Sequence, residues 1–312
     1  MGRFLMKFSR QTTLRAQASV AGVGVHSGLP VTLTLGPAPV DAGFVFIRTG
    51  LEGSDREVQA TAEQVIATDF ATVLGDRNGP LVSTAEHVLA ALRGMGVDNA
   101  IIEIDGPEVP IMDGSAAPFV YLILNEAGVK RLTAPKKFLK VLRPISLSNG
   151  DKRIALYPSD HFKVTYSISF DHPLIRHQSR TMKITDETFV EEIAPARTFG
   201  FLKEVEMLRQ RGLALGGSLD NAIVLGETGV LNNALRFEDE FVRHKILDAI
   251  GDLSLVGYPV IGHLVAHRAG HALHTAFASR ILEEVDAWKI VESDGLPSAV
   301  RVPVAAAARL AN

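Results

Sequence analysis

Alternating apolar and polar residues near the N-terminus give way to apolar residues at helical spacing, which predicts strands followed by helices. Gly and Pro separate the alternating stretches, as expected for turns. An apolar stripe through Val88, Leu89 and Leu92 indicates a helix that ends at Gly94. The predicted elements of this half are strands over 12–20, 29–35 and 43–47, a helix over 83–92, a strand over 99–104 and a helix over 116–127.

The same succession of strands and then helices returns after a basic, Pro-containing stretch, 128–137, which has the composition of a linker. The predicted strands are 138–141, 145–148, 153–157, 162–170 and 260–266, and the predicted helices lie near 186–192, over 202–210, from Asp239 to before Gly257, and from Gly270 onward. Strands followed by helices predict an α+β fold. We expect two similar domains, 1–130 and 136–312, each a β-sheet layered with helices, although no convincing sequence repeat relates them.

Composition narrows the class of protein. The chain has 312 residues, of which 46% are hydrophobic and 21% charged, as in a soluble globular protein, and its net charge of −3 argues against a nucleic-acid binder. There is no cysteine, so a metal would have to be held by His, Asp or Glu. No apolar run resembles a signal peptide or approaches the roughly 18 residues of a membrane helix. We therefore expect a cytoplasmic protein with no membrane segment.

His244 and Asp248 are candidate metal ligands. Residues four positions apart on a helix lie on one face, so an imidazole nitrogen and a carboxylate oxygen can reach one ion without backbone strain. Such a pair also occurs on ordinary solvated helix faces. The spacing alone leaves both interpretations open.

Two further histidines lie in settings that allow a structural or a functional role. Ser83 and Glu86 have the spacing of a capping box, in which case Glu86 would only cap the helix and His87 would be an ordinary first-turn residue. His26 lies in the Gly-rich stretch 23–28 and is expected at a turn between strands, either on the surface or in a site.

Several separated segments together resemble UDP-3-O-acyl-N-acetylglucosamine deacetylase, the zinc-dependent enzyme that commits bacteria to lipid A synthesis. Their order and spacing fit over nearly the whole chain, and no expected zinc or acid–base position departs from the pattern. The segments are 24–28 (GVHSG), 84–87 (TAEH), 111–119 (IMDGSAAPF), 196–201 (ARTFGF), 236–240 (RFEDE), 244–252 (HKILDAIGD) and 270–272 (GHA).

The resemblance implies a zinc amidohydrolase that removes the N-acetyl group of UDP-3-O-(3-hydroxyacyl)-N-acetylglucosamine, giving the free amine and acetate. It implies Zn²⁺ bound by His87, His244 and Asp248, with a fourth position open to water. This ligand set joins the two predicted domains. The active site and the small-molecule substrate are therefore expected at the domain interface.

The resemblance also implies roles for the residues around the zinc. Glu86 would be the general base, and Thr198 and protonated His271 would stabilise the oxyanion, with Asp252 paired to His271. Either His271 or Glu86 would then protonate the departing amine.

The resemblance further implies how the substrate is held. Lys245 would face the sugar-phosphate part of the substrate, Phe199 the hexose and Phe170 the nucleotide, and His26 would also contact the substrate. The acyl chain would lie along the 202–224 segment, whose residues 213–215 suit either a groove wall or a core.

Two other functions remain compatible with the same residues. A zinc amidase acting on another substrate would share the metal ligands and differ at the acyl groove and the diphosphate contacts. A non-catalytic binding module would use these His and Asp residues structurally and would bind no zinc. We expect the first function, in a monomer that binds no nucleic acid.

Overall fold

The computed structural model describes residues 9–53, 56–76, 78–232 and 234–293. The α-helices of these residues are α1 (Glu86–Gly94), α2 (Ala117–Tyr121), α3 (Asp186–Thr188), α4 (Leu202–Gln210), α5 (Glu240–Leu253) and α6 (His271–Glu283). Two of them continue as π-helical turns, α2 into Leu122–Ala127 and α3 into Phe189–Ile193. None of the helices in the described ranges combines the length and apolar character that crossing a membrane requires.

One five-stranded sheet belongs to the first half of the chain. Its strands are β2 (Ala18–Val23), β3 (Pro30–Pro37), β4 (Phe44–Arg48), β5 (Glu57–Gln59) and β9 (Ala100–Ile104). They are ordered β2-β3-β9-β4-β5, so the last strand in sequence lies at the centre. β9 runs parallel to β4, and the other neighbours are antiparallel.

A second five-stranded sheet repeats this topology in the second half. Its strands are β12 (Ile145–Asn149), β13 (Lys152–Tyr157), β14 (Lys163–Ser169), β15 (His177–Lys183) and β19 (His263–His267). Their order is β12-β13-β19-β14-β15, again with the last strand at the centre and parallel to the third. The chain therefore contains a duplicated sheet topology that no sequence repeat revealed.

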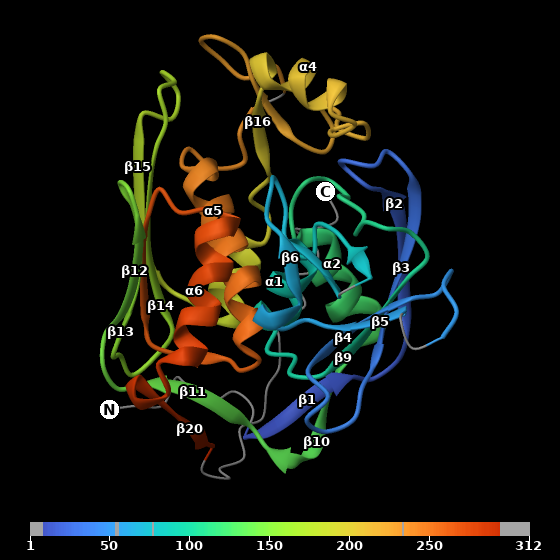
Figure 1. Ribbon diagram of the computed structural model, residues 1–312, viewed down its shortest axis with the longest axis vertical. Coiled ribbons are helices and arrows are strands. Elements are labelled where there is room, and N and C mark those ends of the chain that lie inside the picture. The colour runs from blue at the N-terminus through green and yellow to red at the C-terminus, as the bar shows by residue number, and fades with distance from the viewer. Residues whose placement is uncertain (1–8, 54–55, 77, 233, 294–312) are drawn as a thin grey trace.

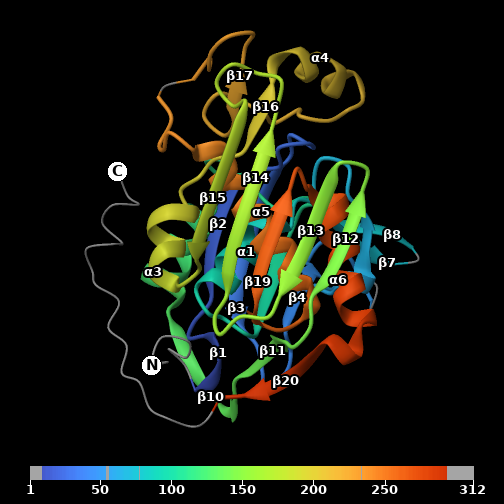
Figure 2. The ribbon, with the colours of Figure 1, turned by 90° about the vertical axis from the view of Figure 1, so that its left-hand side faces the viewer.

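The principal helices occupy equivalent places in the two halves. α1 and α5 each come before the central strand of their sheet, and α2 and α6 each follow it. The two sheets form the outer layers of the molecule and these four helices lie between them (Figure 1, Figure 2). The predicted α+β class, with each sheet layered with helices, is confirmed.

The burial of the strands and helices explains this layering. On β14, Val164, Tyr166 and Ile168 face inward and alternate with partly exposed residues, as expected for a sheet with one covered face. α1 is buried from Glu86 to Leu92, and nearly every residue of α5 is buried. Helices buried on all sides belong to the middle of a molecule.

α1 and α5 come into close backbone contact at Gly251. A Cβ atom at this position would lie 2.1 Å from the backbone oxygen of Glu86, nearer than real Cβ atoms come to any neighbour. Only glycine therefore allows the start of α1 to lie against α5 at this point. The contact brings Glu86 and His87 next to the helix that carries His244 and Asp248.

Four smaller sheets complete the described part of the fold. Their strands are β1 (Arg10–Leu14) with β10 (Val129–Pro135); β11 (Lys137–Val141) with β18 (Val260–Ile261) and β20 (Trp288–Glu292); β6 (Val65–Ala67), β7 (Val73–Asp76) and β8 (Gly79–Val82); and β16 (Phe199–Phe201) with β17 (Ile223–Leu225). The β16–β17 pair carries the segment with α4, which projects at one end of the molecule (Figure 1).

The structure corrects several predicted boundaries. The supposed linker 128–137 contains β10 and the start of β11, because its backbone pairs with other strands despite its basic composition. The predicted strand 12–20 is two strands, β1 and β2, in different sheets. The short strands β5 to β8 and the polar strand β15 were not predicted, since three or four residues give little periodicity and β15 has few apolar residues. The domain limits 1–130 and 136–312 stay a prediction.

Candidate metal centre and active site

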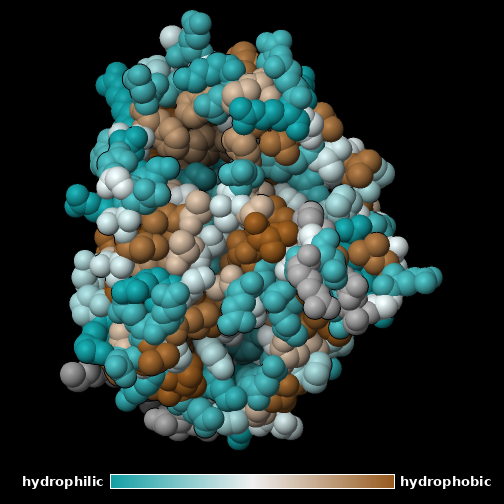
Figure 3. Space-filling view, in the orientation of Figure 1, coloured by the Kyte–Doolittle hydropathy of each residue, from teal (hydrophilic) through white to brown (hydrophobic). Residues whose placement is uncertain are grey.

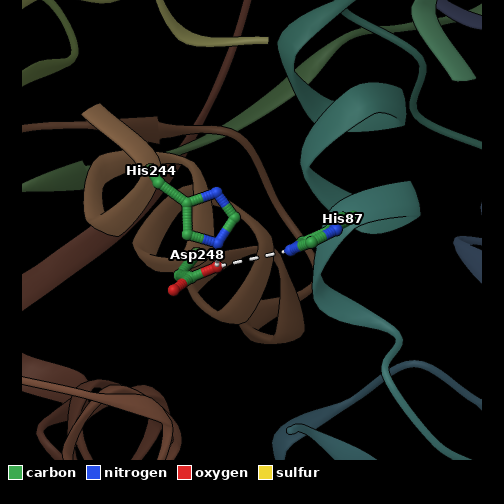
Figure 4. Close-up of side chains that lie close together, drawn as sticks. All are labelled: His87, His244 and Asp248. Carbon is green, nitrogen blue, oxygen red and sulfur yellow. Dashed lines mark ion pairs between the residues drawn. The ribbon is translucent and has the colours of Figure 1, made fainter. Parts of the chain in front are cut away.

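His87, His244 and Asp248 bring their side chains together where α1 and α5 meet (Figure 4). His244 and Asp248 lie one turn apart on α5, with His244 Nε2 3.3 Å from Asp248 Oδ1. His87 is the second residue of α1, and its Nε2 lies 3.7 Å from the same oxygen. All three side chains are buried. The three predicted ligands therefore lie close enough together to bind one ion.

The arrangement of donor atoms fits a metal ion. Donors about 2.0 Å from a tetrahedral ion are separated by about 3.3 Å, close to the distances observed here. Asp248 Oδ1 is buried and has no hydrogen-bond partner among the described residues. A buried carboxylate oxygen without a donor needs a cation beside it. These residues can hold a metal ion.

The charge states of the three candidate ligands favour binding of a metal ion. Burial lowers the pKa of His244 to about 3, so its ring is neutral. Its Nδ1–H donates to the Ala196 oxygen at 3.0 Å, which leaves the Nε2 lone pair directed at the site. Burial opposes the ionisation of Asp248, but its polar surroundings, above all the Lys245 ammonium 2.8 Å from Oδ2, hold its pKa well below its usual value.

Glu86 does not cap α1. α1 begins only at Glu86, and the residue before it is Ala85, whose methyl side chain cannot accept a hydrogen bond. The predicted capping box with Ser83 is therefore wrong. The buried Glu86 carboxylate instead accepts a hydrogen bond from the Thr72 backbone N–H at 3.0 Å.

Burial also makes Glu86 a stronger base than an exposed carboxylate. It raises the pKa of Glu86, an effect that the nearby His271 and His87 partly offset. Glu86 Oε1 lies 3.9 Å from His271 Nε2. The two groups therefore face each other beside the three candidate ligands.

Asp252 pairs with His271 as predicted. The His271 Nδ1–H donates to Asp252 Oδ2 at 2.8 Å. Burial disfavours the charged ring, but Asp252 and Glu86 outweigh it and raise the pKa of His271 to about 9. Burial likewise opposes ionisation of Asp252, while His271 and His274 lower the pKa of its carboxyl to about 2. The pair is an imidazolium beside a carboxylate.

Three residues of this network were not predicted. His274 Nδ1–H donates to Asp252 Oδ2 at 2.9 Å, and the Tyr166 hydroxyl lies 2.8 Å from His274 Nε2. The Thr72 hydroxyl donates to Asp252 Oδ1 at 2.5 Å. His274 could have been noticed as a histidine one helical turn after His271. Nothing in the sequence around Tyr166 or Thr72 distinguishes them from ordinary buried strand and loop residues.

A cavity of about 440 Å³ opens over the candidate ligands. It extends between α4 and the segment 214–231, and Figure 3 shows apolar surface around a hollow at the end of the molecule that carries α4. The predicted site residues that line it are His26, Glu86, His87, Thr198, Phe199, His244, Lys245, Asp248 and His271. Most of the predicted site therefore faces one space.

Two predicted site residues lie outside this lining. Asp252 lies behind His271, fully buried. Phe170 packs edge-on against Phe199, with ring centroids 5.7 Å apart, and lines a separate surface recess with Arg176 and Arg268. Phe170 thus lies behind the cavity wall, in contact with Phe199 and Phe201, which both line the cavity.

Lys245 and Phe199 lie together at the cavity wall. Lys245 Nζ donates to Asp248 Oδ2 at 2.8 Å and lies 5.6 Å from the centre of the Phe199 ring. Burial disfavours the Lys245 cation, but Asp248 raises the pKa of its ammonium above the usual value. Lys245 therefore keeps its positive charge beside a candidate ligand.

His26 and Thr198 reach the cavity from two anchored loops. The backbone N–H of His26 donates to Glu108 Oε1 at 2.9 Å, and burial lowers the pKa of its ring. The Thr198 N–H donates to the Gly114 oxygen at 2.8 Å. Both residues are thus held by backbone contacts and belong to the cavity lining.

The apolar part of the cavity comes from the 202–224 segment and the residues that follow it. Its apolar lining includes Leu202, Val205, Leu208, Ala214, Leu219, Val224 and Leu231. Of the predicted wall residues 213–215, only Ala214 lines the cavity; Leu215 is about half exposed. The cavity over the candidate ligands therefore has an apolar wall formed by α4 and the residues that follow it.

Comparisons with known proteins all point to one family. The family model described as UDP-3-O-acyl N-acetylglycosamine deacetylase matches residues 11–283. Among curated proteins, a UDP-3-O-acyl-N-acetylglucosamine deacetylase from Myxococcus xanthus is 53% identical over 282 residues, 90% of this chain and 89% of the relative. Proteins with the same name from Syntrophotalea carbinolica and Anaeromyxobacter dehalogenans are 51% and 50% identical, each over 91% of both chains.

Replacing one candidate ligand tests the metal centre. We expect His244→Ala to lower the metal content of the purified protein from about one ion per chain to near zero, because two donors bind far more weakly than three. Inductively coupled plasma mass spectrometry measures this directly. His263→Ala is the matched control, because His263 lies on β19, outside the site. Full metal content in His244→Ala would contradict the ligand set.

Proposed function

We propose a residue-level mechanism for this chain from the premise that it belongs to the UDP-3-O-acyl-N-acetylglycosamine deacetylase family. The chain is an amidohydrolase of lipid A biosynthesis, which hydrolyses the N-acetyl group of UDP-3-O-acyl-N-acetylglucosamine to the free amine and acetate. One observation carries the mechanism: three buried metal donors and two facing proton-handling groups share one cavity.

The metal is Zn²⁺, bound by His87, His244 and Asp248. Two neutral imidazoles and a carboxylate, without cysteine, form an ordinary ligand set for catalytic zinc. When bound, zinc supplies a Lewis acid that polarises the amide carbonyl and makes water more acidic. Lys245 offsets the negative charge of Asp248 at Oδ2, which lies 2.8 Å from its ammonium nitrogen.

Glu86 acts as the general base. Its raised pKa makes it a better proton acceptor, and the Thr72 N–H fixes one oxygen so that the other faces the cavity. The attacking water gives one proton to Glu86 while its oxygen bonds to the acetamide carbon. The carbonyl π electrons move to oxygen, and a tetrahedral oxyanion forms.

His271 and Thr198 stabilise that oxyanion. His271 Nδ1 is occupied by Asp252, so its Nε2–H is the group that faces Glu86 and the cavity. Thr198 lines the same cavity, and its hydroxyl donates a second hydrogen bond to the oxyanion. When the C–N bond breaks, the amine nitrogen takes a proton from His271 or from Glu86, and acetate is released.

The remaining residues hold the substrate. Lys245 faces the sugar-phosphate part, Phe199 packs on the hexose, and His26 contacts the substrate from the opposite loop. Phe170 supports Phe199 and contacts the nucleotide from the neighbouring recess. The acyl chain lies in the apolar groove beneath α4. The enzyme works as a cytoplasmic monomer and needs no nucleic-acid partner.

Glu86→Gln tests the general base with little change in shape. We expect turnover to fall by about 10² or more, since the amide cannot accept the proton. Amine release from the acylated UDP-sugar measures turnover, and metal content and melting temperature are measured in parallel. Glu187→Gln, on the exposed side of α3, is the control and should keep parental turnover. Unchanged turnover in Glu86→Gln would show that another group takes the proton.

The Asp252–His271 pair predicts a shift of the high-pH limb of turnover. His271 must be protonated to stabilise the oxyanion, so activity falls as pH rises through its pKa, which is about 9 without a metal and lower beside a bound cation. Asp252→Asn removes the anion that favours the imidazolium, so the limb should move to lower pH. The titratable groups facing His271 are Asp252, Glu86, Asp248, His274 and His26.

A pH–rate profile of Asp252→Asn measures this shift, and His271→Ala is the reference in which the limb should disappear. If both variants keep the high-pH limb of the parental protein, a group other than His271 loses the proton that this limb reports.

A further inference from the structure

Thr72 contacts both proton-handling groups of the proposed mechanism. It lies just before β7 and is fully buried. Its backbone N–H donates to Glu86 Oε2 at 3.0 Å, and its hydroxyl donates to Asp252 Oδ1 at 2.5 Å. The same hydroxyl oxygen lies 3.4 Å from His271 Nδ1. One residue therefore joins the start of α1, the end of α5 and the start of α6.

The other contacts of Asp252 show why the Thr72 hydroxyl matters. Oδ2 accepts hydrogen bonds from both His271 Nδ1–H and His274 Nδ1–H, at 2.8 and 2.9 Å. In the described part of the chain, Thr72 is the hydrogen-bond donor to Oδ1. Without it, nothing on that side fixes the rotation of the carboxylate plane. The His271 ring, which donates its Nδ1 hydrogen bond to Oδ2, would then lose its defined orientation.

We infer that Thr72 is a positioning residue that fixes the Glu86 carboxylate and the His271 ring in position relative to each other. Its hydroxyl orients the Asp252 carboxylate, and Asp252 in turn orients the His271 ring. Its N–H sets the position of Glu86, whose free oxygen lies 3.9 Å from His271 Nε2. The inference rests on the roles proposed above for Glu86 and His271.

Thr72 acts only through these groups. It is not among the residues that line the substrate cavity, although its neighbour Phe70 is. A change at its hydroxyl should therefore alter the chemical step and leave substrate binding as it is. An ordinary packing role would change stability and leave kcat unaffected.

Thr72→Val and Thr72→Ser separate the hydroxyl from the shape of the side chain. Valine keeps the branched shape and the backbone N–H but cannot donate to Asp252, whereas serine keeps the donor. We expect Thr72→Val to lower kcat on the order of 10-fold with KM and metal content unchanged. Thr72→Ser should restore kcat to near the parental value. Equal kcat in Thr72→Val and the parent would overturn the inference.

The same substitution in a His271→Ala background tests the route through His271. If Thr72 acts through this ring, Thr72→Val should lower the residual kcat of His271→Ala by less than about 2-fold. If Thr72→Val lowers kcat in the His271→Ala background by as large a factor as in the parental protein, the inference is overturned and the role of His271 is left intact. Parental kcat in His271→Ala alone would refute the role of His271, and the inference about Thr72 would fall with it.

Discussion

The close contact between α1 and α5 is the constraint on which the site depends. Gly251 allows the backbone of Glu86 to lie against α5 where any side chain would collide with it. Because α1 begins at this contact, its first residues, Glu86 and His87, lie beside His244 and Asp248 on α5. His87 Nε2 comes to lie 3.7 Å from Asp248 Oδ1 as a result. The packing of the two helix backbones therefore determines which side chains meet in the site.

The contact also brings together buried carboxylates whose negative charge would destabilise the fold if they had no partners. Glu86, Asp248 and Asp252 are buried in the helical layers, and an unpaired buried carboxylate costs several kcal/mol. Asp252 is paired with histidines and Thr72, while Asp248 has Lys245 on one oxygen and no donor on the other. A cation at Asp248 Oδ1 completes this pattern, so metal binding should stabilise the folded helix pair as well as supply reactivity.

Sequence reasoning recovered the parts of the site that have local spacing. The i,i+4 relation of His244 and Asp248 and the helix that carries them follow from periodicity, and the pairing of Asp252 with His271 followed from the family resemblance. The spacing of Ser83 and Glu86 gave a wrong prediction, because α1 begins only at Glu86, so that Ser83 is not its N-cap residue and Glu86 is buried. Thr72 and Tyr166 could not be predicted, since their roles depend on contacts across more than a hundred residues. The duplicated sheet topology was likewise invisible, because strand order is preserved without sequence similarity.

Anomalous diffraction tests the metal centre most directly. Crystals of the zinc-loaded protein, measured on both sides of the zinc absorption edge, would locate the ion without reference to activity. The account predicts a peak about 2.0–2.2 Å from Nε2 of His87, Nε2 of His244 and a carboxylate oxygen of Asp248. Asp252, His271 and His274 form the other group of donors close enough to hold an ion in the described part of the chain. A peak at that second group, with none between α1 and α5, would contradict the account.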